Sequence, residues 1–182
     1  MRLPRQAHAG TTIATIHITM HHSKLLAIAA LAITLGLPAF AQTPVSPATD
    51  QAAQLASSDP KIAANKRLVY DFWREVFESG QVSSVEKYVA EGYIQHNPNV
   101  PNGRAALVGF ISSRHASPKP VEDRIKAPLV SITAERDLVT LSFVREYTDP
   151  KDASKKYTTT WFDMFRIENG KIVEHWDSAL RQ

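Results

Sequence analysis

The chain has 182 residues, of which 43% are apolar and 21% are charged, and this fits one globular domain with additional segments. It contains no cysteine, which excludes disulfides, thiolate metal sites and cysteine nucleophiles. The formal net charge is +3, and much of the basic surplus comes from Arg2, Arg5 and Lys24. With no cluster of Lys and Arg interleaved with aromatic residues, the sequence does not indicate a nucleic-acid partner.

Residues 20–41 have the pattern of a secretory signal peptide. Lys24 ends a short basic region, an apolar run follows from Leu25 to Leu37, and Ala39-Phe40-Ala41 is a small-x-small cleavage pattern. The apolar run is shorter than the roughly 20 residues of a membrane span. We therefore expect cleavage after Ala41, a periplasmic or secreted protein and no stable membrane anchor. A retained anchor is the alternative, and Met20 is a candidate for the true start.

Residues 42–58 are rich in Pro, Ser, Thr, Ala and Gln, which predicts a flexible leader before a folded domain of residues 59–182. Asp59 followed by Pro60 predicts the start of a helix, because the carboxylate caps free N–H groups and proline lacks one. Gly80 is expected to end this helix.

Two further helices are predicted downstream. Ser83 and Glu86 have the spacing of a capping box, which predicts a short second helix. The pattern stops in the segment 91–98, which we interpret as a loop. Residues 103–114 recover an apolar stripe at helical spacing, which predicts the third helix.

The periodicity changes from helical to alternating after Val121. Strands are predicted near residues 121–126, 128–135, 137–148, 156–168 and 171–180. Asn169-Gly170 predicts a two-residue hairpin turn between the last two, because a type I′ turn requires positive φ at both positions. Helices followed by a run of strands predict an α+β fold, with the helices on one face of an antiparallel sheet.

The register of this last hairpin predicts an unusual carboxylate. Counting outward from the turn pairs Asp163 with Trp176, on the face that also carries Trp161. The same register places His175 and Asp177 on the opposite face. Asp163 is then expected to lie between two tryptophans.

The order of elements and two motifs resemble a known family. The motifs are YIQHNP at residues 93–98 and DMFRIENGKIVEHWD at residues 163–177. They resemble the SnoaL-like polyketide cyclases of the nuclear transport factor 2-like superfamily, which also contains ketosteroid isomerase and scytalone dehydratase. The resemblance covers about residues 60–180. It implies a cone-shaped half-barrel, in which three N-terminal helices pack in a curved antiparallel sheet, a ligand pocket inside, no cofactor and a homodimer formed through the outer sheet face.

The resemblance also implies catalytic residues. Asp163 matches the carboxylate that acts as base in an aldol ring closure, and His96 matches a histidine that assists it. A second histidine of the family is replaced here by Ser142, which puts the family's substrate and activity in doubt. From the residues alone, Asp163 could instead be a structural carboxylate, and His96 a loop histidine bonded to the backbone.

The expected pocket wall consists of five residues around these two groups: Trp161, Trp176, Ser142, Tyr93 and Phe110. For the last two, ordinary core packing is the alternative. Because His175 and Asp177 are predicted on the outer face, and because spacing places no third ligand beside them, we expect no metal site. A bulge in the strand would exchange the two faces and overturn this expectation.

Three functions remain open from the sequence. The first is a cofactor-free enzyme that removes a proton next to a carbonyl of a small apolar substrate. The second is a small-molecule binding protein without catalysis. The third is a dimeric interaction module that uses an apolar patch around Phe162, Met164 and Val173. The enzyme predicts a closed apolar cavity into which Asp163 and His96 both point.

Overall fold

The computed structural model describes residues 42–182, and the predicted signal peptide lies outside the described residues. Its α-helices are α1 (Gln51–Gln54), α2 (Pro60–Phe72), α3 (Val85–Tyr88) and α4 (Arg104–Arg114). A π-helix, Trp73–Glu78, continues α2, and a 3₁₀ helix, Val82–Ser84, precedes α3. Within residues 42–182, no helix has the length and apolar character that crossing a bilayer requires.

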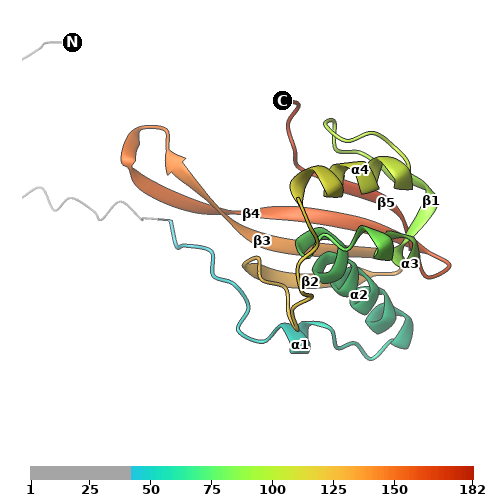
Figure 1. Ribbon diagram of the computed structural model, residues 1–182. Coiled ribbons are helices and arrows are strands. Elements are labelled where there is room, and N and C mark those ends of the chain that lie inside the picture. Colours follow the sequence, from blue (N-terminus) through green and yellow to red (C-terminus); the bar gives the residue numbers. More distant parts are fainter. Residues whose placement is uncertain (1–41) are drawn as a thin grey trace, which may run out of the picture. The chain divides into compact units, whose positions relative to one another are not determined.

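Five strands form one sheet in the order β1-β5-β4-β3-β2. The strands are β1 (Val89–Gln95), β2 (Leu129–Glu135), β3 (Leu138–Asp149), β4 (Asp152–Glu168) and β5 (Lys171–Asp177). Neighbours are antiparallel except β1 and β5, which are parallel. The helices cover one face of the curved sheet, and the β3–β4 hairpin extends beyond them (Figure 1). The predicted α+β cone is confirmed.

The predicted helix boundaries are confirmed at both ends of α2 and its π-helical extension. The carboxylate of Asp59 accepts hydrogen bonds from the backbone N–H groups of Lys61 and Ile62, at 2.7 and 3.3 Å. Gly80 follows the helix with φ of 70°, a conformation in which a side chain would be strained. The prediction of a capping box at Ser83 was wrong, because α3 begins after Ser84 and no side chain caps it.

Two segments differ from the strand prediction. Residues 91–95, interpreted as loop, belong to β1, whose partner β5 lies about 80 residues further along the chain. Residues 121–126, predicted as a strand, have no strand partner in the described chain. Ile125 is nevertheless buried in the core, and its N–H group is satisfied by the Gln51 side chain at 3.1 Å and by the Tyr70 hydroxyl at 3.3 Å.

The packed part of the chain begins before Asp59, where the sequence placed its start. Leu55 is buried in the core, and the Gln51 side chain bonds to the backbone of Ile125 and to the Tyr70 hydroxyl. The N–H of Ala48 also donates to the carbonyl of Leu129 and that of Val45 to the Thr158 hydroxyl, both at 2.8 Å, so most of the predicted leader is docked on the domain. Glutamine can satisfy buried backbone groups from an otherwise polar segment, and composition alone does not reveal this.

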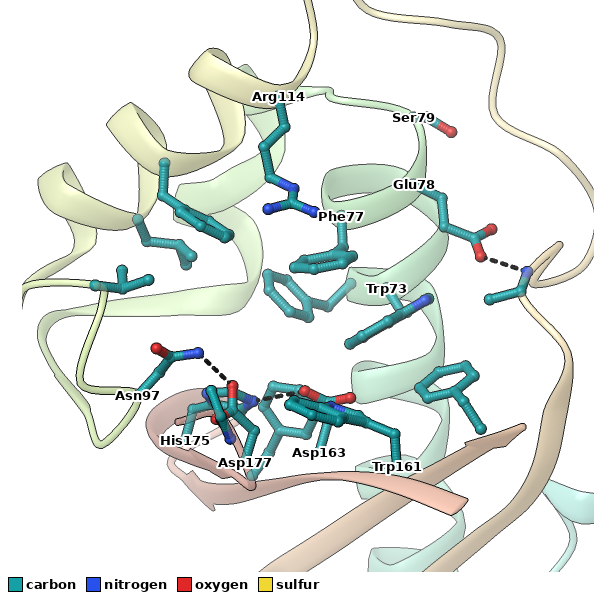
Figure 2. A pocket seen from close by; sticks show the side chains of 18 of the residues that line it. Trp73, Phe77, Glu78, Ser79, Asn97, Arg114, Trp161, Asp163, His175 and Asp177 are labelled. Carbon is teal, nitrogen blue, oxygen red and sulfur yellow. Dashed lines mark hydrogen bonds and ion pairs between the residues drawn. The ribbon is translucent and has the colours of Figure 1, made fainter. Parts of the chain in front are cut away.

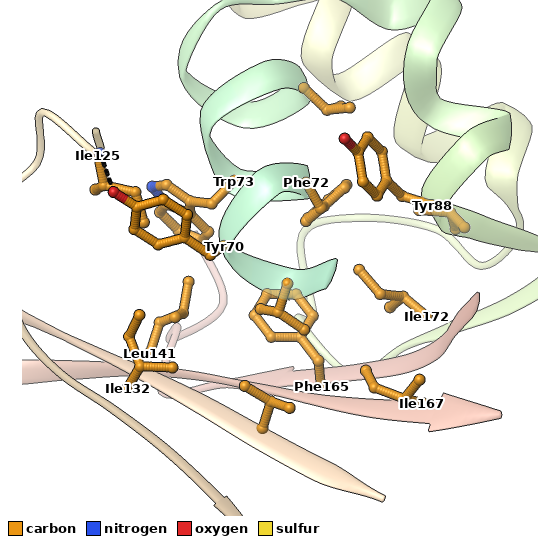
Figure 3. Close-up of a cluster of buried hydrophobic side chains, with 14 of the residues drawn as sticks. Tyr70, Phe72, Trp73, Tyr88, Ile125, Ile132, Leu141, Phe165, Ile167 and Ile172 are labelled. Carbon is orange, nitrogen blue, oxygen red and sulfur yellow. Dashed lines mark hydrogen bonds between the residues drawn. The ribbon is translucent and has the colours of Figure 1, made fainter. Parts of the chain in front are cut away.

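The core lies between α2 and the covered face of the sheet (Figure 3). Phe72 and Phe165 meet edge to face with ring centroids 5.9 Å apart, and Phe72 meets Tyr88 in the same way at 6.1 Å. Full burial of each such side chain stabilises the fold by about 1.5–3 kcal/mol. Phe165 also contacts the ring of His175, which lines the cavity described in the next subsection. The core and the cavity therefore share one wall.

A β-bulge at Val173 determines which side chains of β5 face the helices. The turn has φ of 50° at Asn169 and 71° at Gly170, and Glu168 lies opposite Lys171, as predicted. Ile167 is then opposite Ile172 but Arg166 is opposite Glu174, so Val173 is an extra residue. Beyond it, every side chain of β5 is on the face opposite to the predicted one.

Candidate functional site

A cavity of about 930 Å³ lies between the helices and the sheet (Figure 2). This volume falls within the range of ligand pockets, about 300–1,000 Å³. Aromatic side chains from both the helices and the strands contribute to the wall: Phe72, Trp73, Phe77, Tyr93, Phe110, Phe143, Trp161 and Phe165. The π-helix contributes to this wall, because Trp73 and Phe77 stack on each other at 4.2 Å and Trp73 stacks on Phe143 at 4.6 Å.

Three titratable side chains meet on the strand side of the cavity (Figure 2). Asp163 lies opposite Asp177 in the sheet, and His175 Nε2 is 3.1 Å from Asp163 Oδ1. Asp163 and His175 are 5% and 7% exposed, so both are largely removed from water. The placement of His175 and Asp177 on the outer face was wrong, and the bulge at Val173 is the reason.

The protonation of His175 follows from its second nitrogen. Nδ1 lies 2.8 Å from Gln95 Oε1, and the same oxygen accepts the backbone N–H of Asn97 at 2.9 Å. A backbone N–H only donates, so this contact fixes which end of the Gln95 amide is the oxygen. Oε1 can only accept, and His175 Nδ1 must therefore carry a proton.

This arrangement requires a further proton between His175 and Asp163. If Nε2 lacked one, its lone pair would face a carboxylate oxygen, and two acceptors would be in contact at 3.1 Å. The pair is therefore an imidazolium beside a carboxylate, or a neutral imidazole beside a carboxylic acid. Its net charge is zero in either form. Within residues 42–182, Asp163 Oδ2 makes no hydrogen bond, and it is the oxygen available to a ligand.

Tyr93 brings a hydroxyl to the same end of the cavity. Burial, with the negative charges of Asp177 and Asp163, raises the pKa of Tyr93 far above its ordinary value, so the hydroxyl stays protonated. Its oxygen accepts a hydrogen bond from Gln95 Nε2 at 3.1 Å. No acceptor for the hydroxyl proton lies within the described chain, so Tyr93 can donate to a ligand.

Asp177 is held in place by two donors. Asn97 Nδ2 bonds to Oδ2 at 2.7 Å, and the N–H of Ala179 bonds to Oδ1 at 2.9 Å. The ligand atoms of Asp163, His175 and Asp177 lie within 4.8 Å of one another, so these three could hold a metal ion. The prediction that no third ligand lies beside His175 and Asp177 was therefore wrong, because the bulge at Val173 brings both to the face of Asp163.

His96 lies outside the cavity, although the sequence predicted it as the assisting donor. Its Nε2 is 2.7 Å from Glu174 Oε1, and its ring stacks on Trp176 at 5.0 Å. Both partners are on the outer face of the sheet. Residues alternate faces here, so Tyr93, Gln95 and Asn97 line the cavity while His96 does not.

The predicted wall residues divide into two groups. Trp161, Tyr93 and Phe110 line the cavity. Trp176 and Ser142 do not: Trp176 is on the outer face with His96, and Ser142 alternates with Leu141 and Phe143, so it also faces outward. The Ser142 hydroxyl accepts a hydrogen bond from Ser131 at 3.2 Å. Asp163 thus has one indole beside it and not two.

On the outer face, Glu174 connects His96 to Arg166. Arg166 Nε donates to Glu174 Oε2 at 2.8 Å. The hydrogen bond from His96, and then that from Arg166, hold the pKa of Glu174 below its usual range although partial burial opposes this. A depressed pKa means that the charged carboxylate stabilises the folded state, and that this contribution is lost as the pH falls through the folded pKa.

We expect Glu174→Gln to lower the free energy of unfolding by about 1 kcal/mol at neutral pH, because a partly exposed pair is screened. The difference from the wild type should be full above the ordinary glutamate pKa of about 4.3 and should shrink below it. Urea denaturation at a series of pH values measures this. A difference that does not change with pH would show that the ionised carboxylate is not what stabilises the fold.

A second expectation concerns Gln95. In Gln95→Met, the N–H groups of His175 and Asn97 both lose their acceptor, and stability should fall by about 1–3 kcal/mol. The proton of neutral His175 is then free to move to Nε2, where it can bond to Asp163. ¹⁵N chemical shifts of the imidazole nitrogens report this, and His96 is the internal control. An unprotonated Nδ1 in the wild type would contradict the argument.

Sequence comparison assigns the family. The pattern of the SnoaL-like domain matches residues 69–175, more than half of the chain. The chain belongs to the SnoaL-like domain family. A comparison with curated proteins found no match.

Solved structures to which the chain is similar include TsrD from Streptomyces laurentii, with 19% identity and a TM-score of 0.45, covering 67% of this chain and 90% of that one. A protein from Acidithiobacillus ferrooxidans, whose assignment as a polyketide cyclase is provisional, has 18% identity and a TM-score of 0.46, covering 67% and 89%. A protein of unknown function from Burkholderia pseudomallei has 16% identity and a TM-score of 0.42, covering 63% and 88%.

Proposed function

We propose that this chain is an exported enzyme that needs no cofactor and removes a proton next to a carbonyl group of a small, largely apolar substrate. The observation that carries the proposal is the free oxygen of Asp163, which faces an aromatic cavity beside a hydroxyl that can donate. A carboxylate positioned beside the carbon next to a carbonyl can act as its general base. Export rests on the sequence pattern of residues 20–41.

In the proposed reaction, Asp163 Oδ2 takes the proton from the carbon next to the carbonyl. The bonding pair of that C–H bond moves into the enolate, whose oxygen accepts a hydrogen bond from Tyr93. The His175–Asp163 pair changes from net charge zero to +1 as the substrate gains its negative charge. A fixed positive charge beside a developing enolate in a low-dielectric site favours its formation.

The same proton can complete an aldol closure. The enolate carbon attacks a second carbonyl, and one C–C bond forms while the π bond of that carbonyl becomes an alkoxide. The pair then returns its proton to the alkoxide and is neutral again. His175 takes the assisting role that the sequence gave to His96, and it acts through Asp163 without contact to the substrate.

The test does not require the natural substrate. Incubation of the protein with a panel of aromatic methyl ketones and 1,3-diketones in D₂O, followed by ¹H NMR, measures loss of the proton next to the carbonyl. We expect exchange faster than in buffer, and faster with aromatic ketones than with acetone, because the cavity wall is aromatic. Exchange at the buffer rate across the panel would contradict the proposal and would favour a binding protein without catalysis.

The homodimer is also part of this proposal. Phe162 is 50% exposed on the outer face of β4, and Met164 on the same face of this strand is partly exposed. Val173 on the neighbouring strand β5 is also partly exposed. An exposed apolar patch of this kind favours association between proteins. Sedimentation equilibrium should give the mass of two chains.

A further inference from the structure

The two ends of the cavity differ in charge. Asp163 and Asp177 lie on the strand side, and Arg114, the last residue of α4, extends into the cavity from the helix side (Figure 2). Arg145 on β3 also lines the cavity. Because the His175–Asp163 pair has no net charge, an anionic group would be repelled by Asp177 and attracted to Arg114 and Arg145.

Each of these guanidinium groups lies on an aromatic ring of the cavity wall. Arg114 Cζ is 5.1 Å from the centroid of Phe110, and Arg145 Cζ is 5.0 Å from the centroid of Trp161. Such contacts hold a cation in place without neutralising its charge. Both side chains keep their N–H donors for a ligand, because within residues 42–182 neither makes a hydrogen bond or an ion pair.

The acidic side chains on the helix side are already engaged. The carboxylate of Glu78 accepts the backbone N–H groups of Lys126 and Ala127 at 2.9 and 2.8 Å. Glu122 forms an ion pair with Lys126 Nζ at 3.2 Å. These contacts direct both carboxylates toward residues 126–127, and neither carboxylate pairs with Arg114 or Arg145.

We propose that Arg114 and Arg145 bind the anionic group of an amphipathic substrate, a keto acid with an aromatic or alkyl body. The acid group lies at the arginines, the apolar body lies along the aromatic wall, and the carbonyl lies at Asp163 and Tyr93. Planar guanidinium groups match the two oxygens of a carboxylate. The position of the carbonyl rests on the proposed function, whereas the anion site does not.

Two fluorescent probes that share one apolar body test the anion site. 8-Anilinonaphthalene-1-sulfonate carries a negative charge, and N-phenyl-1-naphthylamine is its neutral counterpart. Loss of a hydrogen bond to a charged group in a partly exposed site weakens binding about five- to tenfold. We expect this loss for the sulfonate in Arg114→Gln and in Arg145→Gln, and less than about a twofold change for the neutral probe.

Arg67→Gln is the matched control. Arg67 is also exposed and also lies on an aromatic ring, 5.8 Å from the centroid of Tyr70, but it does not line the cavity. The Arg67→Gln substitution should change neither the affinity for the sulfonate nor that for the neutral probe. If Arg114→Gln and Arg145→Gln both keep the wild-type ratio of the two affinities, the inference is overturned. It is also overturned if the sulfonate does not bind, whatever the neutral probe does.

A matched keto acid and its methyl ester connect this site to catalysis. In the D₂O assay, we expect the acid to exchange at lower concentrations than the ester, and Arg114→Gln to remove this difference. If the probes discriminate but no ketone exchanges, the anion site stands and the proposed function fails. If ketones exchange but the acid and the ester behave alike and the probes do not discriminate, the function stands and this inference fails.

Discussion

Replacing Asp163 by asparagine is expected to slow proton exchange on a reactive ketone by about 10²–10⁴-fold, the contribution that a positioned acid or base makes. The amide is nearly isosteric but cannot accept the proton. It can donate from Nδ2 to Nε2 of neutral His175, so the contact across the sheet is retained. The loss should therefore appear in the rate constant and not in ligand affinity, and NMR exchange rates together with fluorescence titrations separate the two.

Asp137→Asn is the control for this substitution. Asp137 is a partly exposed carboxylate 3.5 Å from Arg166, outside the cavity. The Asp137→Asn protein should keep the wild-type rate of proton exchange. An Asp163→Asn protein that folds, binds the neutral naphthylamine as the wild type does and still exchanges at the wild-type rate would remove the base from the mechanism.

Replacing Phe165 by alanine is expected to lower the free energy of unfolding by about 3–5 kcal/mol. Phe165 is 2% exposed and packs edge to face on Phe72 of α2. Its other neighbour is the His175 ring, with centroids 4.7 Å apart, so one side chain supports both the helix and the proton-holding pair. The residual cavity would also loosen His175, and we expect the exchange rate to fall even where the variant is fully folded.

Phe162→Ala is the matched control, because it changes the same residue type on the same strand. Phe162 is 50% exposed on the outer face, and its loss should cost at most about 0.5 kcal/mol in the monomer. Urea denaturation midpoints of the two variants, at concentrations too low for association, give the comparison. Equal losses would mean that Phe165 is not part of the wall between core and cavity.

Local chemistry in the sequence predicted both ends of the longest helical segment and the hairpin turn. The cap at Asp59, the glycine at position 80 and the turn at Asn169-Gly170 each depend on neighbouring residues. The resemblance carried by residues 93–98 and 163–177 supplied the cone. β1 was missed because its partner is distant along the chain, and a short edge strand with a glycine has little periodicity of its own.

The candidate site was only partly predictable. Asp163, Tyr93, Phe110 and Trp161 were placed in the cavity, but His175 and Asp177 were placed on the wrong face. The bulge at Val173 has no local signal, because valine fits either a regular or a bulged strand. Alternation could have identified Gln95 and Asn97, which flank His96 and share the face of Tyr93, had residues 91–95 been predicted as a strand.

The extra residue in β5 couples the length of this hairpin to the faces of its side chains. If the strand kept all of its residues but lost the bulge, Val173 would pair with Arg166, Glu174 and Trp176 would turn toward the helices, and His175 and Asp177 would turn toward solvent. A one-codon deletion at position 173 would instead remove the bulge together with its extra residue, and His175 and Asp177 would stay opposite Phe165 and Asp163. When gene sequences related to this one are aligned, a gap at this position is therefore compatible with an unchanged set of cavity side chains, whereas a regular strand of full length is not.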